Sequence, residues 1–215
     1  MTSALREEIC RVGASLYARG YVHATAGNIS VRTDEGYIIT PTDACLGNLD
    51  PAKLAIVNAA GEQTSGDKAS KTLTLHREIY RSDPDARCVI HTHSTHLVAL
   101  TLLGVWSQDD ILPPITPYYV MKVGHVPVIP YCRPGDPAVG ALVATCISAM
   151  RNKGTPIRAV MLERLGPNVW HTNPANASAV LEELEETARL YLLARPQALS
   201  DDQLNALKTH FGSHW

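Results

Sequence analysis

The chain lacks a strong net charge and a long hydrophobic run, and its first residues do not predict a secretory leader. Its 215 residues carry a formal net charge of -2, so the charge balance does not point to nucleic acid or an anionic membrane as a partner. No apolar run approaches the roughly 20 residues that cross a bilayer. Arg6, Glu7 and Glu8 interrupt the apolar stretch that a secretory signal requires near the start. We therefore expect a cytoplasmic protein.

Cysteine motifs are also lacking. The five cysteines contain no CxxC pair, and their number is odd. Both features argue against a disulfide scaffold and against a thiolate zinc site. We expect these cysteines to be small core residues rather than nucleophiles. They are Cys10, Cys45, Cys88, Cys132 and Cys146.

No repeat, low-complexity tract or linker divides residues 1–215, so one domain is expected. Apolar residues make up 45% of the chain, which is enough for a sizeable core. Periodicity predicts helices over 3–19, 70–80 and 94–103, and further helices that begin near 136 and 173. It predicts strands over 29–32, 37–40, 87–92, 126–129, 158–162 and 168–170. Because the strands and helices do not alternate strictly, they favour a mixed or antiparallel sheet with helices packed on it.

The helix that begins near 173 is expected to be amphipathic. Its apolar positions, from Val180 through Leu184 to Tyr191, repeat at helical spacing and are expected to face inward. The glutamates at 182, 183, 185 and 186 are expected to form its solvated side.

Three short segments carry small polar groups that suit an anion. Residues 25–30 read Thr-Ala-Gly-Asn-Ile-Ser, and Thr40-Pro41-Thr42 ends the next strand. Glycine lets the backbone approach a ligand, and amides and hydroxyls together can cradle a phosphate. Ser70 and Lys71 lie at an expected helix start, where free amides favour an anion. Taken alone, each pattern is more often an ordinary turn or helix cap.

Two histidines are spaced to share one face of the strand predicted over 87–92. Positions i and i+2 of a strand point to the same side, so His91 and His93 would present two imidazoles together. Two imidazoles are half of a typical zinc site. Strand histidines that only form hydrogen bonds are equally common, so the pair alone leaves metal binding open. His96, one helical turn further on, is expected to pack or cap.

In their order, these segments resemble the class II aldolase/adducin family. Residues 46–51, 131–136 and 182–188 extend the match, which runs from about Leu5 to Arg195. Within the family the chain is most similar to the 3-oxo-tetronate 4-phosphate decarboxylases, and more distantly to L-fuculose-phosphate aldolase and ribulose-phosphate 4-epimerase. The resemblance implies an α/β fold, a three-layer α/β/α single domain with a central, mainly antiparallel sheet. It also implies a homotetramer with active sites between subunits.

The resemblance further implies a carbon–carbon lyase that decarboxylates a small phosphorylated 3-oxo sugar acid. A divalent metal, with zinc as the first choice, would act as a Lewis acid and stabilise the enediolate that remains. His91 and His93 would bind this metal. Tyr118, or its neighbour Tyr119, would be an acid that acts across the subunit interface. The residues implied to hold the substrate phosphate are Gly27, Asn28, Thr42, Ser70 and Lys71.

Two positions depart from the family pattern. Thr72 occupies the catalytic position where the family has an acidic residue, and Leu165 occupies that of a third metal histidine. Threonine cannot act as a carboxylate base and leucine cannot bind metal, whereas catalytic zinc normally has three protein ligands. His125 and His171 are replacement candidates by residue type only, and we expect His125 to cap or pack rather than to bind metal. Metal binding is therefore expected to be weak or absent.

These departures leave three hypotheses open. The chain is a metal-dependent decarboxylase or aldolase with a rebuilt site, a divergent enzyme with altered and even metal-free chemistry, or a non-catalytic homologue that binds a ligand or partner. The intact Gly27–Ser30 and Thr40–Thr42 segments and Lys71 favour retained ligand binding. Thr72 and Leu165 favour altered or lost chemistry, and fold alone does not decide function.

Overall fold

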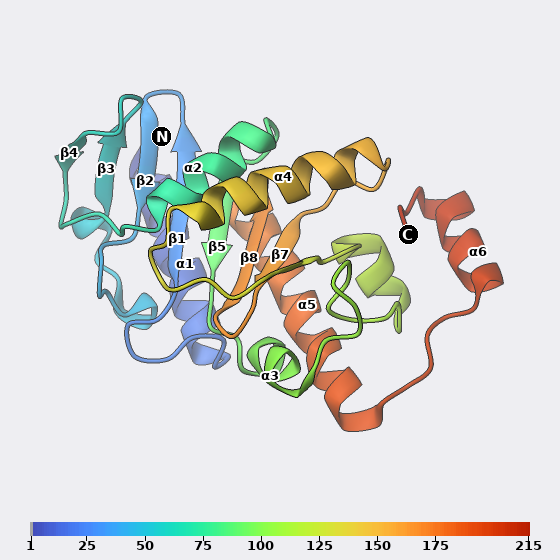
Figure 1. The fold of residues 1–215 in the computed structure, drawn as a ribbon. Helices are drawn as coiled ribbons and strands as arrows, with labels where there is room; N and C mark the ends of the chain where they lie inside the picture. The colour runs from blue at the N-terminus through green and yellow to red at the C-terminus, as the bar shows by residue number, and fades with distance from the viewer. Residues whose placement is uncertain (1) are drawn as a thin grey trace.

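The computed structural model describes residues 2–215, which form three layers around one eight-stranded sheet (Figure 1). The strand order is β4-β3-β2-β1-β5-β8-β7-β6. Paired neighbours are antiparallel, apart from β6 and β7, which are parallel. The predicted mainly antiparallel sheet is thereby confirmed. The strands are β1 (Asn28–Thr33), β2 (Gly36–Ile39), β3 (Ala55–Asn58), β4 (Gln63–Ser65), β5 (Cys88–His91), β6 (Val128–Ile129), β7 (Ala159–Leu162) and β8 (Gly166–His171).

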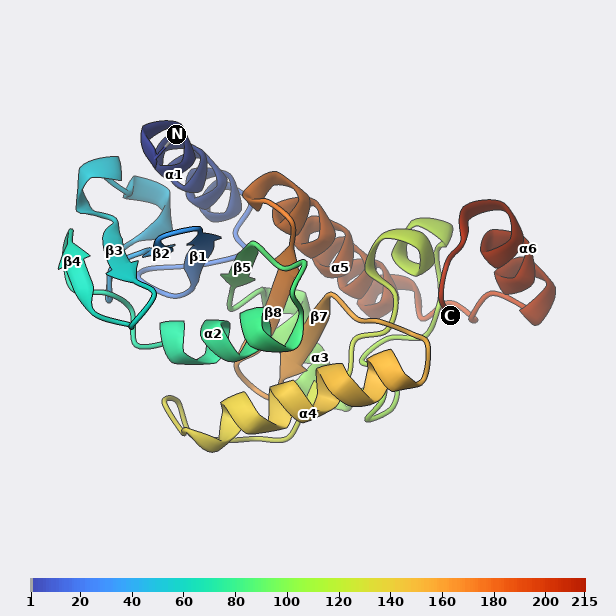
Figure 2. The ribbon, with the colours of Figure 1, turned by 90° about the horizontal axis from the view of Figure 1, so that it is seen from above.

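Helices cover both faces of the sheet. Seen from above, α1 and α5 lie on one side of the strands, and α2 and α4 lie on the other (Figure 2). A short π-helix spans Tyr119–Val123. No helix within residues 2–215 is long and apolar enough to cross a membrane. The α-helices are α1 (Thr2–Ala18), α2 (Leu73–Ser82), α3 (Thr95–Leu103), α4 (Ala138–Asn152), α5 (Pro174–Ala194) and α6 (Asp201–Phe211).

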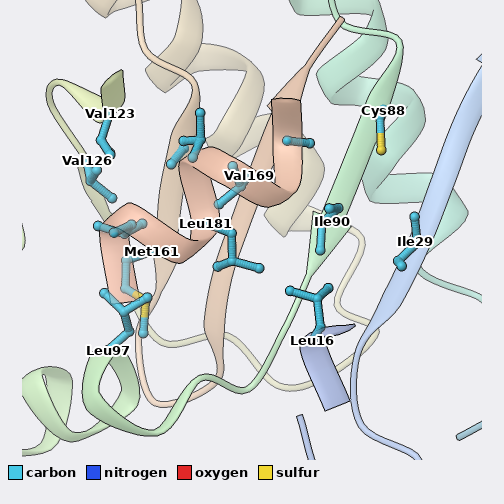
Figure 3. Close-up of a cluster of buried hydrophobic side chains, with 14 of the residues drawn as sticks. Leu16, Ile29, Cys88, Ile90, Leu97, Val123, Val126, Met161, Val169 and Leu181 are labelled. Carbon is cyan, nitrogen blue, oxygen red and sulfur yellow. The ribbon is translucent and has the colours of Figure 1, made fainter. Parts of the chain in front are cut away.

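Strand alternation sorts the side chains of β5 into two cores. Ile90 is buried in a cluster with Leu16 of α1 and Leu181 of α5 (Figure 3). Its neighbour Val89 is buried in the second cluster, between the sheet and α2 and α4. Because side chains repeat with period two along a strand, His91 points to the same side as Val89. This alternation places His91 on the face of the sheet that α2 and α4 cover.

The predicted elements are present, with shifted ends. Helix α2 begins at Leu73, so residues 70–72 form a turn that precedes it. Strand β5 ends at His91, and His93 lies in the loop that follows. Strands β3 and β4 and helix α6 were not predicted. Helix α6 nevertheless begins with a capping box between Ser200 and Gln203, which is a recognisable start signal.

Glu185 is buried, so the prediction that it lies on the solvated side of α5 was wrong. Its Oε1 accepts a hydrogen bond from the His96 amide at 2.9 Å, and its Oε2 accepts one from the Leu97 amide at 3.1 Å. Its Oε1 also lies 2.8 Å from Nδ1 of His96. The carboxylate thus caps the first turn of α3, where the helix dipole favours a negative charge. The His96 ring contacts this carboxylate, in line with the predicted packing role, whereas the cap of α3 is Glu185.

We predict that Glu185→Ala lowers the free energy of unfolding by about 2–4 kcal/mol, because the amides of α3 lose a charged acceptor. Glu186→Ala is the matched control. Its side chain is 46% exposed and forms an ion pair with Arg189 on the same helix, so its loss should cost less than about 1 kcal/mol. Urea unfolding of the two variants measures the difference. Equal effects would contradict the capping role of Glu185.

Candidate functional site

A cleft of about 1140 Å³ opens where β1 and β8 begin and β5 ends. The first turns of α2 and α4 form part of its wall, together with the loop before α4. The structure therefore brings together residues that are up to 143 positions apart in the sequence, from 25 to 168. The residues singled out in the sequence that line this cleft are Gly27, Asn28, Thr42, Ser70, Lys71, Thr72, His91, His93 and Leu165.

Two loops at one end of the cleft are held together by backbone hydrogen bonds. The Thr42 amide donates to the Lys68 carbonyl at 2.9 Å, and the Ser70 amide donates to the Thr40 carbonyl at 3.3 Å. The hydroxyls of Ser70 and Thr72 are 2.8 Å apart. Lys71 is exposed between them. This end of the cleft therefore concentrates hydroxyls and one cation, a combination that suits a phosphate.

Gly27 lies at the same end of the cleft and packs its backbone against β5. It has a φ of +83°, a conformation that favours glycine. A Cβ atom here would lie 2.8 Å from the carbonyl oxygen of His91 and 2.8 Å from Cγ1 of Val22. The glycine is therefore required both for the backbone turn and for the contact with β5. That contact brings the loop at 25–28 next to His91.

His91 and His93 place their rings 5.1 Å apart, centroid to centroid, with an interplanar angle of 68°. Nδ1 of His91 lies 2.9 Å from the carbonyl oxygen of Pro167. A carbonyl only accepts, so Nδ1 carries the proton and Nε2 keeps its lone pair. Burial, and then the neighbouring His93, lower the pKa of His91 to about 4. Burial, and then the exposed His23, lower the pKa of His93. Both rings are therefore neutral at pH 7, as a metal ligand must be.

Two asparagines stand on either side of His91 in the sheet. In the strand register, His91 pairs with Asn28 of β1 and with Asn168 of β8. Asn168 is fully buried, and Asn28 is 6% exposed. Oδ1 of Asn28 and both polar side-chain atoms of Asn168 find no hydrogen-bond partner among the described residues. Asn168 was not predicted as a site residue from the sequence. The available signal was its strand position, because Asn168 and Trp170, two positions apart, share one face of β8.

A second buried histidine, His76 of α2, contacts β1 close to these residues. Ser30 Oγ lies 2.7 Å from Nδ1 of His76 and 2.8 Å from the hydroxyl of Tyr80, which donates to the Ser30 carbonyl at 2.9 Å. Because the Tyr80 hydroxyl proton goes to the Ser30 carbonyl, the Ser30 hydroxyl donates to the Tyr80 oxygen. Nδ1–H of His76 then donates to Ser30 Oγ. Burial, and then His91, lower the pKa of His76 to about 3, so its Nε2 stays unprotonated.

The residues of the cleft fit a divalent ion as a two-histidine site. Imidazole nitrogen is a common zinc ligand, so the donor type of the two rings suits such an ion. Within residues 2–215, no group of three His, Cys, Asp or Glu side chains is arranged to hold a metal ion. Leu165 and Thr72 both line the cleft, so the two departures fall in the site itself.

Neither His125 nor His171 lines the cleft, so neither supplies the missing ligand there, and His125 packs as expected. His125 contacts Asp110 Oδ2 through Nδ1 at 2.7 Å and stacks on Trp215 with ring centroids 4.4 Å apart. His171 Nε2 lies 2.6 Å from a guanidinium nitrogen of Arg158. Each ring is held by contacts of its own outside the cleft.

Neither tyrosine candidate lines the cleft of its own subunit. Tyr118 is 61% exposed, at the start of the π-helix. Tyr119 is buried against Trp215, with ring centroids 5.6 Å apart, and burial raises its pKa. A role for Tyr118 across a subunit interface stays a prediction, whereas Tyr119 packs in the core.

Comparison with known proteins gives matches along nearly the whole chain. The family model described as Class II Aldolase and Adducin N-terminal domain matches residues 7–192. A 3-oxo-tetronate 4-phosphate decarboxylase of Cupriavidus necator is 58% identical, over 99% of this chain and 98% of that protein. The Pectobacterium atrosepticum protein of the same name is 43% identical, over 87% and 84% of the two chains.

Solved structures agree with this match. YgbL from Escherichia coli superposes with a TM-score of 0.85 at 38% identity, over 96% of this chain and 99% of that one. L-Fuculose-1-phosphate aldolase from Thermus thermophilus gives a TM-score of 0.73 at 29% identity, over 91% and 97% of the two chains. The similarity therefore concerns the whole three-layer fold and not a single motif.

We predict that Leu165→His combined with Thr72→Glu strengthens divalent metal binding at least about tenfold, because the double variant adds two ligand types that zinc uses. Calorimetric zinc titration measures the affinity, with Leu165→Phe combined with Thr72→Gln as a control that adds no comparable ligand. An unchanged affinity would mean that position 165 does not face the two histidines. Stoichiometric zinc that survives dialysis of the unchanged protein against a chelator would contradict the expectation of weak binding.

Proposed function

This chain belongs to the class II aldolase and adducin family, and from this premise we propose that it is a lyase that decarboxylates a phosphorylated 3-oxo sugar acid. One observation carries the proposal: hydroxyls and a lysine suited to a phosphate line the same cleft as two neutral imidazoles. Relatives named 3-oxo-tetronate 4-phosphate decarboxylase, up to 58% identical, support this substrate class.

The cleft offers separate places for the two ends of such a substrate. Thr42, Ser70 and Lys71 would bind the phosphate, with the Gly27–Asn28 backbone closing around it. His91 and His93 would lie at the reacting carbons. A substrate bound in this way is oriented at both ends, and such positioning can supply several kcal/mol of a barrier.

His91 and His93 would hold a divalent ion, for which zinc is proposed because imidazole suits it. When bound, such an ion acts as a Lewis acid that stabilises the negative charge left on the substrate as carbon dioxide departs. The Pro167 carbonyl keeps the His91 ring in the tautomer that exposes Nε2. Burial keeps both rings unprotonated.

Thr72 favours decarboxylation over aldol cleavage. Aldol cleavage must remove a proton from a hydroxyl group, and so it needs a base. A carboxylate is already ionised at pH 7: the C1–C2 bond breaks, C1 leaves as carbon dioxide, and the electron pair stays on C2. One proton then gives dihydroxyacetone phosphate. The missing carboxylate base at position 72 therefore costs decarboxylation less than it costs aldol chemistry.

The alternative is an altered or non-catalytic homologue, which Leu165 favours because no third histidine joins His91 and His93. Such a protein would still bind sugar phosphates at Ser70 and Lys71.

We also propose a homotetramer in which Tyr118 serves a neighbouring subunit. Its 61% exposure, beside the buried Tyr119, supports this role.

We predict turnover of 3-oxo-tetronate 4-phosphate to dihydroxyacetone phosphate, followed through an NADH-coupled dehydrogenase. His91→Ala should lower kcat/KM at least about 100-fold, since losing a metal ligand exceeds the 10–100-fold cost of losing a residue that only supports one. His171→Ala, outside the cleft, is the control and should stay within about threefold. Thermal stabilisation by sugar phosphates without any turnover would favour the non-catalytic alternative.

A further inference from the structure

Asn168 is a polar side chain of the cleft whose burial carries an unfavourable free energy. It is fully buried, and neither its Oδ1 nor its Nδ2 finds a hydrogen-bond partner within residues 2–215. Leaving a buried polar group unpaired costs about 1–3 kcal/mol, and native proteins rarely tolerate it without a reason. Asn168 also lines the cleft. A partner that comes from the ligand would remove this cost.

The sheet fixes the place of this carboxamide. Asn168 is the register partner of His91, and the Cα atoms of such antiparallel pairs lie about 4.5–5.5 Å apart. The two side chains rise from the same face of the sheet. Nδ1 of His91 is tied to the carbonyl of Pro167, the residue before Asn168. The carboxamide is therefore held beside a ring that faces the reacting end of the substrate.

The unpaired atoms define the group that would satisfy them. Oδ1 needs a hydrogen donor and Nδ2 needs an acceptor. A hydroxyl group is both, and a carboxylate is an acceptor only. Hydrocarbon side chains of Leu75, Leu162 and Leu165 line the cleft nearby and offer neither. A hydroxyl next to a carboxylate, which is the end of a 2-hydroxy acid, would satisfy both atoms.

We propose that Asn168 recognises the 2-hydroxyl group of the substrate and makes the site specific for 2-hydroxy-3-oxo acids. The inference rests on the proposed function, because the phosphate at Lys71 directs the acid end toward His91 and Asn168. Asn28 lies on the other side of His91, and its Oδ1 is also without a hydrogen-bond partner among the described residues. It would face the acid end of the substrate as well. A site that pairs with a substrate hydroxyl rejects analogues that lack it, because its own polar atoms are then left unpaired.

The test uses two unreactive ligands that differ in one group. Erythronate 4-phosphate has the 2-hydroxyl group, and 3,4-dihydroxybutanoate 4-phosphate lacks it. Neither has a 3-ketone, so neither can lose carbon dioxide. Calorimetry gives Kd for both ligands with the unchanged protein, with Asn168→Leu and with Asn176→Leu, an exposed asparagine outside the cleft.

We expect the unchanged protein and Asn176→Leu to prefer the hydroxylated ligand at least about tenfold. In Asn168→Leu the ratio should fall to about one, because only the hydroxylated ligand loses a contact with Oδ1, whereas a contact between Nδ2 and the carboxylate is lost for both ligands alike. The melting temperature of Asn168→Leu without ligand should stay equal or rise, because the variant removes an unsatisfied polar group. Should it not fold, Asn168→Ala answers the same question.

Each other result overturns the inference in a distinguishable way. An unchanged preference in Asn168→Leu, or an equal loss of affinity for both ligands, would show that Asn168 does not contact the 2-hydroxyl group. Binding of both ligands without preference by the unchanged protein would sink this inference alone. Failure to bind either ligand would sink the proposed function and this inference with it.

Discussion

The site depends on one hydrogen bond across the sheet, from Nδ1 of His91 to the carbonyl of Pro167. It joins the last residue of β5 to the second residue of β8 at 2.9 Å. The bond fixes which ring nitrogen carries the proton and which one faces the cleft. Gly166 makes the close approach possible, because a Cβ there would lie 1.9 Å from the Thr92 carbonyl. The position of the imidazole is thus set by backbone geometry.

The surroundings of the two histidines agree with a ligand that brings its own negative charge, and the carboxylates of the cleft belong to other parts of its lining, at Asp43, Glu78, Asp136 and Glu163. The two imidazoles are neutral, the flanking asparagines are uncharged, and Thr72 adds no carboxylate. Lys71 and Arg133 are the cations that line the cleft. A phosphorylated acid would supply the charges that these residues lack, and decarboxylation makes the least demand on a protein base. Burial of His91 weakens its basicity but keeps its lone pair free for a ligand.

The sequence was sufficient for the layered fold and for most of the cleft, because the apolar periods and the family motifs are local. The sequence was insufficient where a side chain contacts residues that are far away along the chain. Glu185 follows a solvated pattern along α5 but caps α3, from which it is separated by 88 positions. Asn168 becomes visible only when the register of β5 and β8 is known. His125 and His171 have the right residue type for a ligand, yet residue type does not tell which side of the sheet a ring faces.

The most direct test of the account is nitrogen NMR of the histidine rings during zinc titration. We expect the His91 ring to start as the Nδ1–H tautomer, and zinc to shift Nε2 of His91 together with the His93 ring, while His125 and His171 stay unchanged. An Nε2–H tautomer at His91, or zinc shifts confined to histidines outside the cleft, would contradict it.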